Sequence, residues 1–362
     1  ILFTSGSTGN AKGALSTHRA VTTGIYNYAL SLAALKAVLV SEGTPPPENL
    51  RTLVNVPLFH VTGEIPVMLN SFVINRSMVL MKKWDAGEAL RLIQDEKITY
   101  FVGVPTMSLE LMQHPDHDKY DLSTLTDIAA GGAARPADHV QRLRDTFKTA
   151  EPAIGYGLTE TNAVGCGNVR SNYAAKPNST GRATAPIVEL AILDDDGVQL
   201  PAGERGEVSI RSAANIEGYF RDPAATAAAF TADGWFRSGD IGYLDEDGYL
   251  FIVDRKKDII IRGGENIACV EVEAALYAHE AVAEASVFGV PSDRLGEEPV
   301  AVVHLNDGET LTEADLCAFA AERLAAFKVP ASIYVSPEPL PKLGTGKIDK
   351  VSLRAAWAKR GA

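Results

Sequence analysis

The sequence predicts an α/β protein with a large N-terminal domain and a small α+β C-terminal domain. Over the first half of the chain, short apolar runs typical of strands alternate with helical patterns, and this texture changes twice further on. The 362 residues also exceed what one hydrophobic core usually organises. We therefore expect two domains, over residues 1–256 and 257–362.

The first half of the chain favours largely parallel sheets covered by helices. Strands are expected around residues 53, 79, 100 and 128, and a helix is expected from Ala89. The most apolar run, residues 29–40, is interrupted by Lys36 and is too short to span a bilayer. We interpret it as a buried or amphipathic helix and expect no transmembrane segment.

From about Ile187 the pattern changes to short strands joined by DG and GE turns, which predicts an antiparallel β subdomain. After DRKKD at 254–258 it changes again, to a small α+β unit. Helices are expected over 270–278 and 311–327, and strands over 283–290 and 300–305. The last helix has a capping pair and one apolar face, formed by Thr312 and Asp315 and by Leu316, Phe319, Ala320, Leu324 and Phe327.

Charge and cysteine content exclude several classes of protein. With 34 basic and 46 acidic residues, the net charge of −12 disfavours a general nucleic-acid or anionic-membrane surface. Cys166, Cys269 and Cys317 lie far apart, which indicates neither a zinc site nor a disulfide framework. A reduced, cytoplasmic setting is expected.

The chain opens on a glycine-rich stretch, ILFTSGSTGNAKGA at 1–14. Its backbone N–H groups, hydroxyls and Lys12 suit a phosphate-binding loop. The Walker spacing fails, however, because Ala11 and Gly13 stand where a glycine and a hydroxyl are needed. Residues 1–3 also look like a buried strand without upstream neighbours, so we expect this chain to be the later part of a longer protein.

Four further motifs follow: GYGLTET at 155, SGDIG at 238, VDRKKDIIIRGGEN at 253 and PKLGTGKID at 341. In this order and at these separations, the five motifs closely resemble the signatures of the adenylate-forming superfamily, in its acyl-CoA synthetase branch. The likeness covers essentially the whole chain. It implies a large domain, lacking the segment that precedes the glycine loop in the family, and a C-terminal lid that moves about Lys257.

The resemblance also implies site residues and substrates. The nucleotide would be ATP, with Mg²⁺ on Glu160 and coenzyme A as the second substrate. Lys347 would bridge the substrate carboxylate and the α-phosphate, which Thr159 also contacts, and these two with Glu160 form the expected catalytic set. The expected ATP and AMP contacts are Thr4, Ser5, Gly6, Ser7, Thr8, Gly9, Lys12, Gly131, Gly132, Ala133, Tyr156 (adenine), Gly157, Asp240 (ribose) and Arg255. His60 is placed at the acyl pocket, where a satisfied core histidine is the alternative, and the thiol step is assigned to Gly263, Gly264, Glu265 and Asn266.

The implied activity is that of an AMP-forming carboxylic acid:CoA ligase. A fatty acid is the first expectation for the acid, and an aryl acid is the second. A ligase that loads a carrier protein is a close alternative. A nucleotide-binding relative without catalysis, or an inactive fragment, is the alternative from another class.

Overall fold

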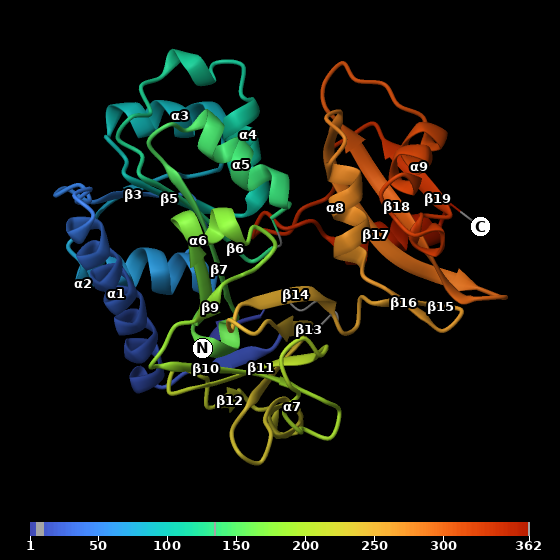
Figure 1. Cartoon of the computed structure of the whole chain (residues 1–362), viewed down its shortest axis with the longest axis horizontal. Helices are drawn as coiled ribbons and strands as arrows, with labels where there is room; N and C mark the ends of the chain where they lie inside the picture. The colour runs from blue at the N-terminus through green and yellow to red at the C-terminus, as the bar shows by residue number, and fades with distance from the viewer. Residues whose placement is uncertain (5–10, 134, 361–362) are drawn as a thin grey trace. The chain divides into compact units, whose positions relative to one another are not determined.

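The structure is a computed structural model that describes residues 1–4, 11–133 and 135–360. It consists of two compact units (Figure 1). The N-terminal unit comprises Ile1–Ser238 and Tyr243–Phe251, and the C-terminal unit comprises Gly239–Gly242 and Ile252–Ala362. From Ile252 onward the chain stays in the C-terminal unit, which begins a few residues before position 257. The predicted domain boundary between residues 256 and 257 stays a prediction.

A seven-stranded sheet organises the N-terminal unit, in the order β4-β3-β5-β6-β7-β8-β9. Strands β4 to β7 are parallel, and β8 and β9 continue the sheet antiparallel. This confirms the four strands expected around residues 53, 79, 100 and 128. Their bounds are β3 Arg51–Val54, β4 Ser77–Leu80, β5 Tyr100–Gly103, β6 Asp127–Gly131, β7 Glu151–Gly157, β8 Gly165–Val169 and β9 Arg182–Ala183.

Three helices bury their apolar sides against one face of this sheet. The fully buried side chains of Phe101 and Ile128 from the strands meet those of Leu90 and Leu143 from the helices. The helix expected from Ala89 begins earlier, because the Asp85 side chain accepts a hydrogen bond from Glu88 N at 2.8 Å. The helices are α3 Ala86–Asp95, α4 Pro105–Gln113 and α5 Ala137–Thr146, with α6 Arg170–Ala175 beside β7 and β8.

Helix α1, His18–Ser41, is longer than the run expected over 29–40. Its 24 residues and a mean hydropathy of 1.3 over its most apolar window make it long and apolar enough to cross a membrane. The apolar run is thus part of a longer helix, because Thr17 caps the helix well before the run begins. Such a helix is weak evidence for a membrane span, since core helices pass the same test. It packs on η1 Gly63–Leu69 and α2 Asn70–Val73.

The first strand is not a buried strand that lacks neighbours, as the sequence suggested. Strand β1, Leu2–Phe3, pairs antiparallel with β2, Gly13–Leu15, which pairs in turn with β12, Gly218–Tyr219. The side chain of Phe3 is 66% exposed. The neighbours come from downstream in the chain, so this reason for expecting a longer protein does not hold.

The antiparallel subdomain expected from Ile187 is present as a four-stranded sheet in the order β10-β11-β13-β14. Strands β10 and β11 pair antiparallel over the whole length of β10. The bounds are β10 Val188–Leu193, β11 Gly206–Ser212, β13 Phe236–Leu244 and β14 Leu250–Arg255, with α7 Pro223–Ala229 following β12.

The C-terminal unit is built on a second sheet, in the order β16-β15-β18-β17, with β19 parallel to β18. The elements are β15 Ile260–Arg262, β16 Glu265–Ile267, α8 Cys269–Tyr277, β17 Val282–Ser292, β18 Gly296–Leu305, α9 Glu313–Ala321, η4 Ala326–Lys328, β19 Ser332–Ser336 and α10 Lys350–Ala358. The capping pair of Thr312 and Asp315 is confirmed. The helix expected over 311–327 ends at Ala321, because the chain then turns so that Leu324 and Phe327 reach the same core.

Candidate active site

Three predicted segments of the N-terminal unit lie at one edge of its parallel sheet. The segment with His60 follows β3, Gly131 ends β6 and is followed by Gly132 and Ala133, and Thr159 and Glu160 follow β7. Ligands of open α/β sheets bind outside the carboxyl ends of the strands. The sheet topology therefore brings together residues that are far apart in the sequence, at the edge where a ligand is expected.

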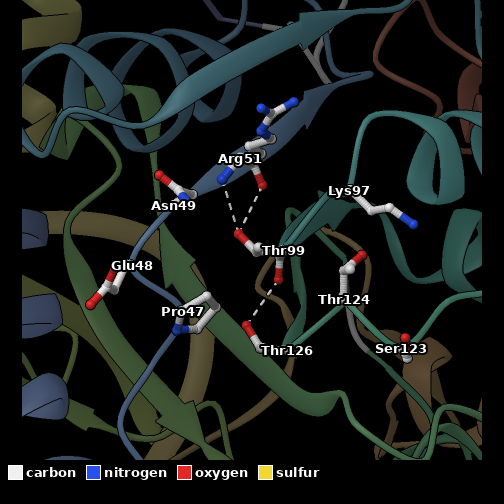
Figure 2. Close-up of a pocket in the computed structure, with 9 residues that line it drawn as sticks. All are labelled: Pro47, Glu48, Asn49, Arg51, Lys97, Thr99, Ser123, Thr124 and Thr126. Carbon is white, nitrogen blue, oxygen red and sulfur yellow. Dashed lines mark hydrogen bonds between the residues drawn. The ribbon is translucent and has the colours of Figure 1, made fainter.

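The opposite edge of the sheet carries an open pocket of about 440 Å³ (Figure 2). It is lined by residues that precede or begin the strands, among them Arg51, Thr99 and Thr126. Their polar groups already bond one another: Arg51 N donates to Thr99 Oγ1 at 3.0 Å, and Thr126 Oγ1 donates to Thr99 O at 3.0 Å. This pocket contains none of the predicted site residues.

The GYGLTE segment forms the end of β7 and the short helix η3, Thr159–Thr161. A side chain at Gly157 is excluded, because its Cβ would lie 2.3 Å from Ala163 O. Tyr156, Thr159 and Glu160 are all partly buried. The close approach of the backbone at Gly157 and Ala163 thus fixes the main chain from which the Thr159 and Glu160 side chains extend.

Tyr219 connects the glycine-rich stretch with Glu160, and the sequence analysis did not single it out. The Lys12 ammonium lies 4.9 Å from the centre of the Tyr219 ring, and the Tyr219 hydroxyl donates to Glu160 Oε1 at 2.7 Å. Burial, and then the Glu160 carboxylate, raise the pKa of Tyr219, so its hydroxyl stays a donor. No local pattern in the sequence marks Tyr219, because only the pairing of β12 with β2 brings the Gly-Tyr pair at 218–219 to this place.

Hydrogen bonds join the backbone segments before and after residues 5–10. Thr4 N donates to Lys12 O at 2.9 Å, and Lys12 N donates to Thr4 Oγ1 at 3.2 Å. The other expected phosphate contacts of this stretch, Ser5, Gly6, Ser7, Thr8 and Gly9, lie outside the described residues. Thr4 and Lys12 are thus hydrogen-bonded neighbours on either side of residues 5–10.

Glu160 fits the part of a magnesium ligand. Tyr219 occupies one carboxylate oxygen, and no other described residue is hydrogen-bonded to the carboxylate. Within the described residues there is no group of three or more His, Cys, Asp and Glu side chains that could hold a metal. Proteins commonly bind Mg²⁺ with one or two carboxylates, while substrate phosphates and water complete the shell.

A second group of predicted residues comes together in the C-terminal unit. Asp240 is 4% exposed, and its Oδ1 lies 3.1 Å from Arg255 Nε. The pKa of Lys347 is lowered to about 8, chiefly by burial and then by Arg255, against an opposing effect of Asp240. The three side chains interact electrostatically although Lys347 lies far from Asp240 and Arg255 in the sequence.

Two further predicted segments lie in the C-terminal unit. Lys257 is in the turn after β14, where burial lowers its pKa. Gly263 and Gly264 form the two-residue turn between β15 and β16, with φ values of 60° and 91° that favour glycine. Glu265 and Asn266 follow and are exposed.

His60 lies in the loop after β3 and is half-buried. Its Nδ1 accepts a hydrogen bond from Thr62 N at 3.3 Å. This bond fixes the orientation of the ring within its own loop.

Comparison with known proteins identifies a family for both parts of the chain. The model of AMP-binding enzymes matches residues 1–220, and the model of the AMP-binding enzyme C-terminal domain matches residues 271–347.

The chain is similar to the long-chain-fatty-acid–CoA ligase of Bacillus subtilis (strain 168), with 38% identity over 96% of this chain and 59% of that protein. Feruloyl-CoA synthase of an Amycolatopsis species is 37% identical over 98% of this chain and 69% of that protein. Among solved structures, ATP-bound MatB from Rhodopseudomonas palustris has a TM-score of 0.82 and 30% identity, over 99% of this chain and 67% of that one. The o-succinylbenzoate coenzyme A synthetase of Bacillus subtilis, in complex with ATP and magnesium, has a TM-score of 0.82 and 29% identity, over 98% and 69%. The chain thus spans between about three fifths and seven tenths of the length of these relatives.

Proposed function

The chain belongs to the family of AMP-binding enzymes, the adenylate-forming superfamily, and from this premise we propose that it is a carboxylic acid:CoA ligase. A carboxylate oxygen of the acid attacks the α-phosphorus of ATP, and the bond to the leaving pyrophosphate breaks. The sulfur of CoA then loses its proton and attacks the acyl carbon, and AMP leaves. The observation that carries this proposal is the grouping of Lys347, Asp240 and Arg255 in the C-terminal unit.

Each of these three side chains suits one part of an acyl-adenylate. The Lys347 ammonium can offset negative charge between the acid and the α-phosphate in the transition state. With a pKa of about 8 it is mostly protonated at neutral pH. The buried Asp240 carboxylate only accepts hydrogen bonds, which suits the two hydroxyls of a ribose. Arg255 is exposed enough to reach the ribose or a phosphate.

The N-terminal unit supplies the remaining contacts in this proposal. Backbone N–H groups of the glycine-rich turn and Lys12 bind the β- and γ-phosphates. Tyr156 stacks on adenine beside Gly131–Ala133, Gly157 gives the backbone its close packing, and Thr159 binds the α-phosphate. Glu160, oriented by Tyr219, would hold Mg²⁺, which neutralises phosphate charge when it is bound.

The second step needs a different arrangement of the two units. Lys347 serves the first step, so the C-terminal unit is proposed to turn about Lys257 before CoA attacks. The hairpin with Gly263, Gly264, Glu265 and Asn266 would then line the thiol channel. Its exposed turn and its position in the same unit as Lys347 support this assignment.

A fatty acid is our first choice for the acid, and an aryl acid is the second, with His60 at the acyl pocket. The relatives support both, since one is named a long-chain-fatty-acid–CoA ligase and another a feruloyl-CoA synthase. We place the reaction in the cytoplasm, because the three cysteines are free thiols.

The decisive experiment measures both half-reactions of the full-length protein. A panel of fatty and aryl acids is offered with ATP and Mg²⁺, and acid-dependent pyrophosphate release is recorded. Lys347→Ala is expected to abolish this release while it spares transfer to CoA from supplied acyl-adenylate. Equal loss of both steps would refute the role of Lys347.

A parallel assay separates the alternatives. Offering CoA and a phosphopantetheinylated carrier protein side by side identifies the acceptor, and failure to form any acyl-CoA would exclude the CoA ligase. Binding of ATP without pyrophosphate release from any acid would instead favour a nucleotide-binding relative without catalysis.

A further inference from the structure

We propose that Glu284 is a positioning residue that holds the loop carrying Lys347 in place for adenylation. This inference rests on the role proposed for Lys347. The loop comprises residues 340–349, between β19 and α10, and is called the lysine loop below. All residues that carry the argument lie within the C-terminal unit.

The lysine loop is a small, internally bonded structure. Lys342 and Ile348 face each other in an antiparallel bridge. Leu343 N donates to Lys347 O at 2.8 Å, and Asp349 N donates to Pro341 O at 2.7 Å. A shift of either end would therefore move Lys347 with the rest of the loop.

Glu284 holds the first end of this loop through two contacts. One carboxylate oxygen, Oε2, accepts a hydrogen bond from Leu340 N at 2.6 Å. The other, Oε1, lies 2.8 Å from Lys342 Nζ. Glu284 is 7% exposed, so its carboxylate interacts with these two protein groups more than with water.

A bulge in β17 aims Glu284 at the loop. Val282 pairs with Leu305 and Glu284 pairs with His304, which leaves Ala283 as an extra residue in the strand. From there the side chains alternate, so Glu284 lies on the same side of β17 as Phe288. Phe288 belongs to the apolar cluster that also contains Leu340 and Ile348 from the lysine loop.

The far end of the loop is attached to the same strand. Lys350 is the first residue of α10. Its Nζ lies 2.8 Å from Glu273 Oε1 and donates to Val287 O at 3.1 Å. Both ends of the lysine loop are thus joined to β17 or α8 by charged groups, of which Glu284 is buried and Glu273 and Lys350 are half-buried. These contacts at both ends of the loop position the Lys347 side chain. The position matters because a displacement of about 1 Å at a catalytic group can lower the rate roughly 100-fold.

Burying Glu284 is costly for folding, and an apolar side chain would avoid that cost. Replacing a buried ion pair with apolar residues of similar size is often neutral or stabilising, whereas removing one partner is not. An apolar residue, however, could accept no hydrogen bond from Leu340 N. This difference provides a test that separates positioning from stability.

The test uses the paired variant Glu284→Met/Lys342→Met in the full-length protein. It removes both contacts and leaves no unpaired buried charge. We expect acid-dependent pyrophosphate release to fall about 10- to 100-fold. Transfer to CoA from supplied acyl-adenylate should stay within about twofold of the wild type, although the melting temperature falls because the buried Leu340 N loses its acceptor.

The matched control is Glu271→Gln. Glu271 also pairs with a lysine of the same unit, with Lys328 Nζ 2.6 Å from its Oε1, and neither residue belongs to the lysine loop. The control is expected to leave both half-reactions unchanged. The single variant Glu284→Gln, which can still accept from Leu340 N, should lie between the wild type and the paired variant.

Lys347→Ala is measured in parallel, so that two kinds of failure are distinguishable. If it retains pyrophosphate release, the proposed role of Lys347 is refuted. If it abolishes release while the paired variant matches the wild type, the positioning role of Glu284 is overturned. Equal loss of both half-reactions in the paired variant would also overturn it, since that indicates a merely structural role.

Discussion

Lys347 has the least ordinary surroundings of the proposed site residues. Its ammonium is partly buried and lies within the electrostatic reach of Arg255 and Asp240. Burial and the Arg255 guanidinium both disfavour its charged form, and the Asp240 carboxylate favours it. The balance leaves the pKa of Lys347 at about 8, close enough to neutral pH to affect the reaction.

We predict that kcat/KM for adenylation decreases above about pH 8. This parameter reports the free enzyme, in which Lys347 loses its proton as the pH rises through its pKa. The check is a pH profile of acid-dependent pyrophosphate release for the wild type and for Lys347→Arg. A guanidinium stays charged, so the high-pH decrease should move upward in the variant even if its activity is low. An unmoved decrease would assign the titration to another group.

At the residue scale, the sequence predicted the groups whose chemistry shows in a local motif. Asp240, Arg255 and Lys347 stand in recognisable short stretches, and the structure brings them together. Tyr219 and Glu284 were missed, because their parts depend on partners about 60 residues away in the chain. A tyrosine or a glutamate within a strand carries no local signal of such contacts.

At the scale of the elements, strands were predicted best where they lie in the core. The buried runs of β3, β5 and β6 are apolar because helices cover them. Strand β1 was wrongly predicted to be buried, because its side chains are apolar although Phe3 is exposed. The start of α1 was missed because Thr17, and not the beginning of the apolar run, caps it.

The buried Asp254 carboxylate links two elements, because it joins the end of β14 to the start of α8. One oxygen accepts from Arg255 N at 2.7 Å, and the other accepts from Cys269 N. Burial raises its pKa to about 6, against an opposing effect of Lys350. A carboxyl whose pKa is raised on folding contributes stability below its unfolded value, near pH 4, and loses it as the pH rises through 6.

We predict that Asp254→Asn gains stability relative to the wild type between pH 4 and 7. The gain should approach roughly 3 kcal/mol, the equivalent of about two pKa units. Asparagine can accept a hydrogen bond from only one of the two N–H groups, so the variant also loses some stability at every pH. The test is therefore how the difference in unfolding free energy between the two proteins changes with pH, and not its value at a single pH. Trp357 fluorescence in urea, with Trp84 and Trp235 replaced by Phe, follows unfolding of the C-terminal unit. A difference between the two proteins that does not change with pH would contradict the prediction.

At the scale of the whole molecule, each change of texture in the sequence corresponds to a new sheet. The change near Ile187 precedes the antiparallel sheet, and the change after 254–258 precedes the C-terminal sheet. The place where the chain passes between the units could not be read from the sequence. Strands β13 and β14 continue past it, so their patterns show no break at Ser238 or Phe251.

The C-terminal unit contains the whole of its own core. One cluster is built around Val272, Val287, Val303 and Leu316, and a second joins Phe288 to side chains of the lysine loop and α10. Every residue of both clusters lies after position 259. A unit that buries its apolar side chains against one another needs no other part of the chain in order to fold.

We therefore predict that residues 252–362 fold when expressed alone. Circular dichroism should show mixed α and β structure and a cooperative melting transition, in the range of about 45–65 °C usual for domains of this size. Val287→Asp should abolish the transition, because that side chain is fully buried, whereas Ile261→Asp should retain it, because Ile261 is 56% exposed. A non-cooperative transition together with binding of a hydrophobic dye would show that this core needs the rest of the chain.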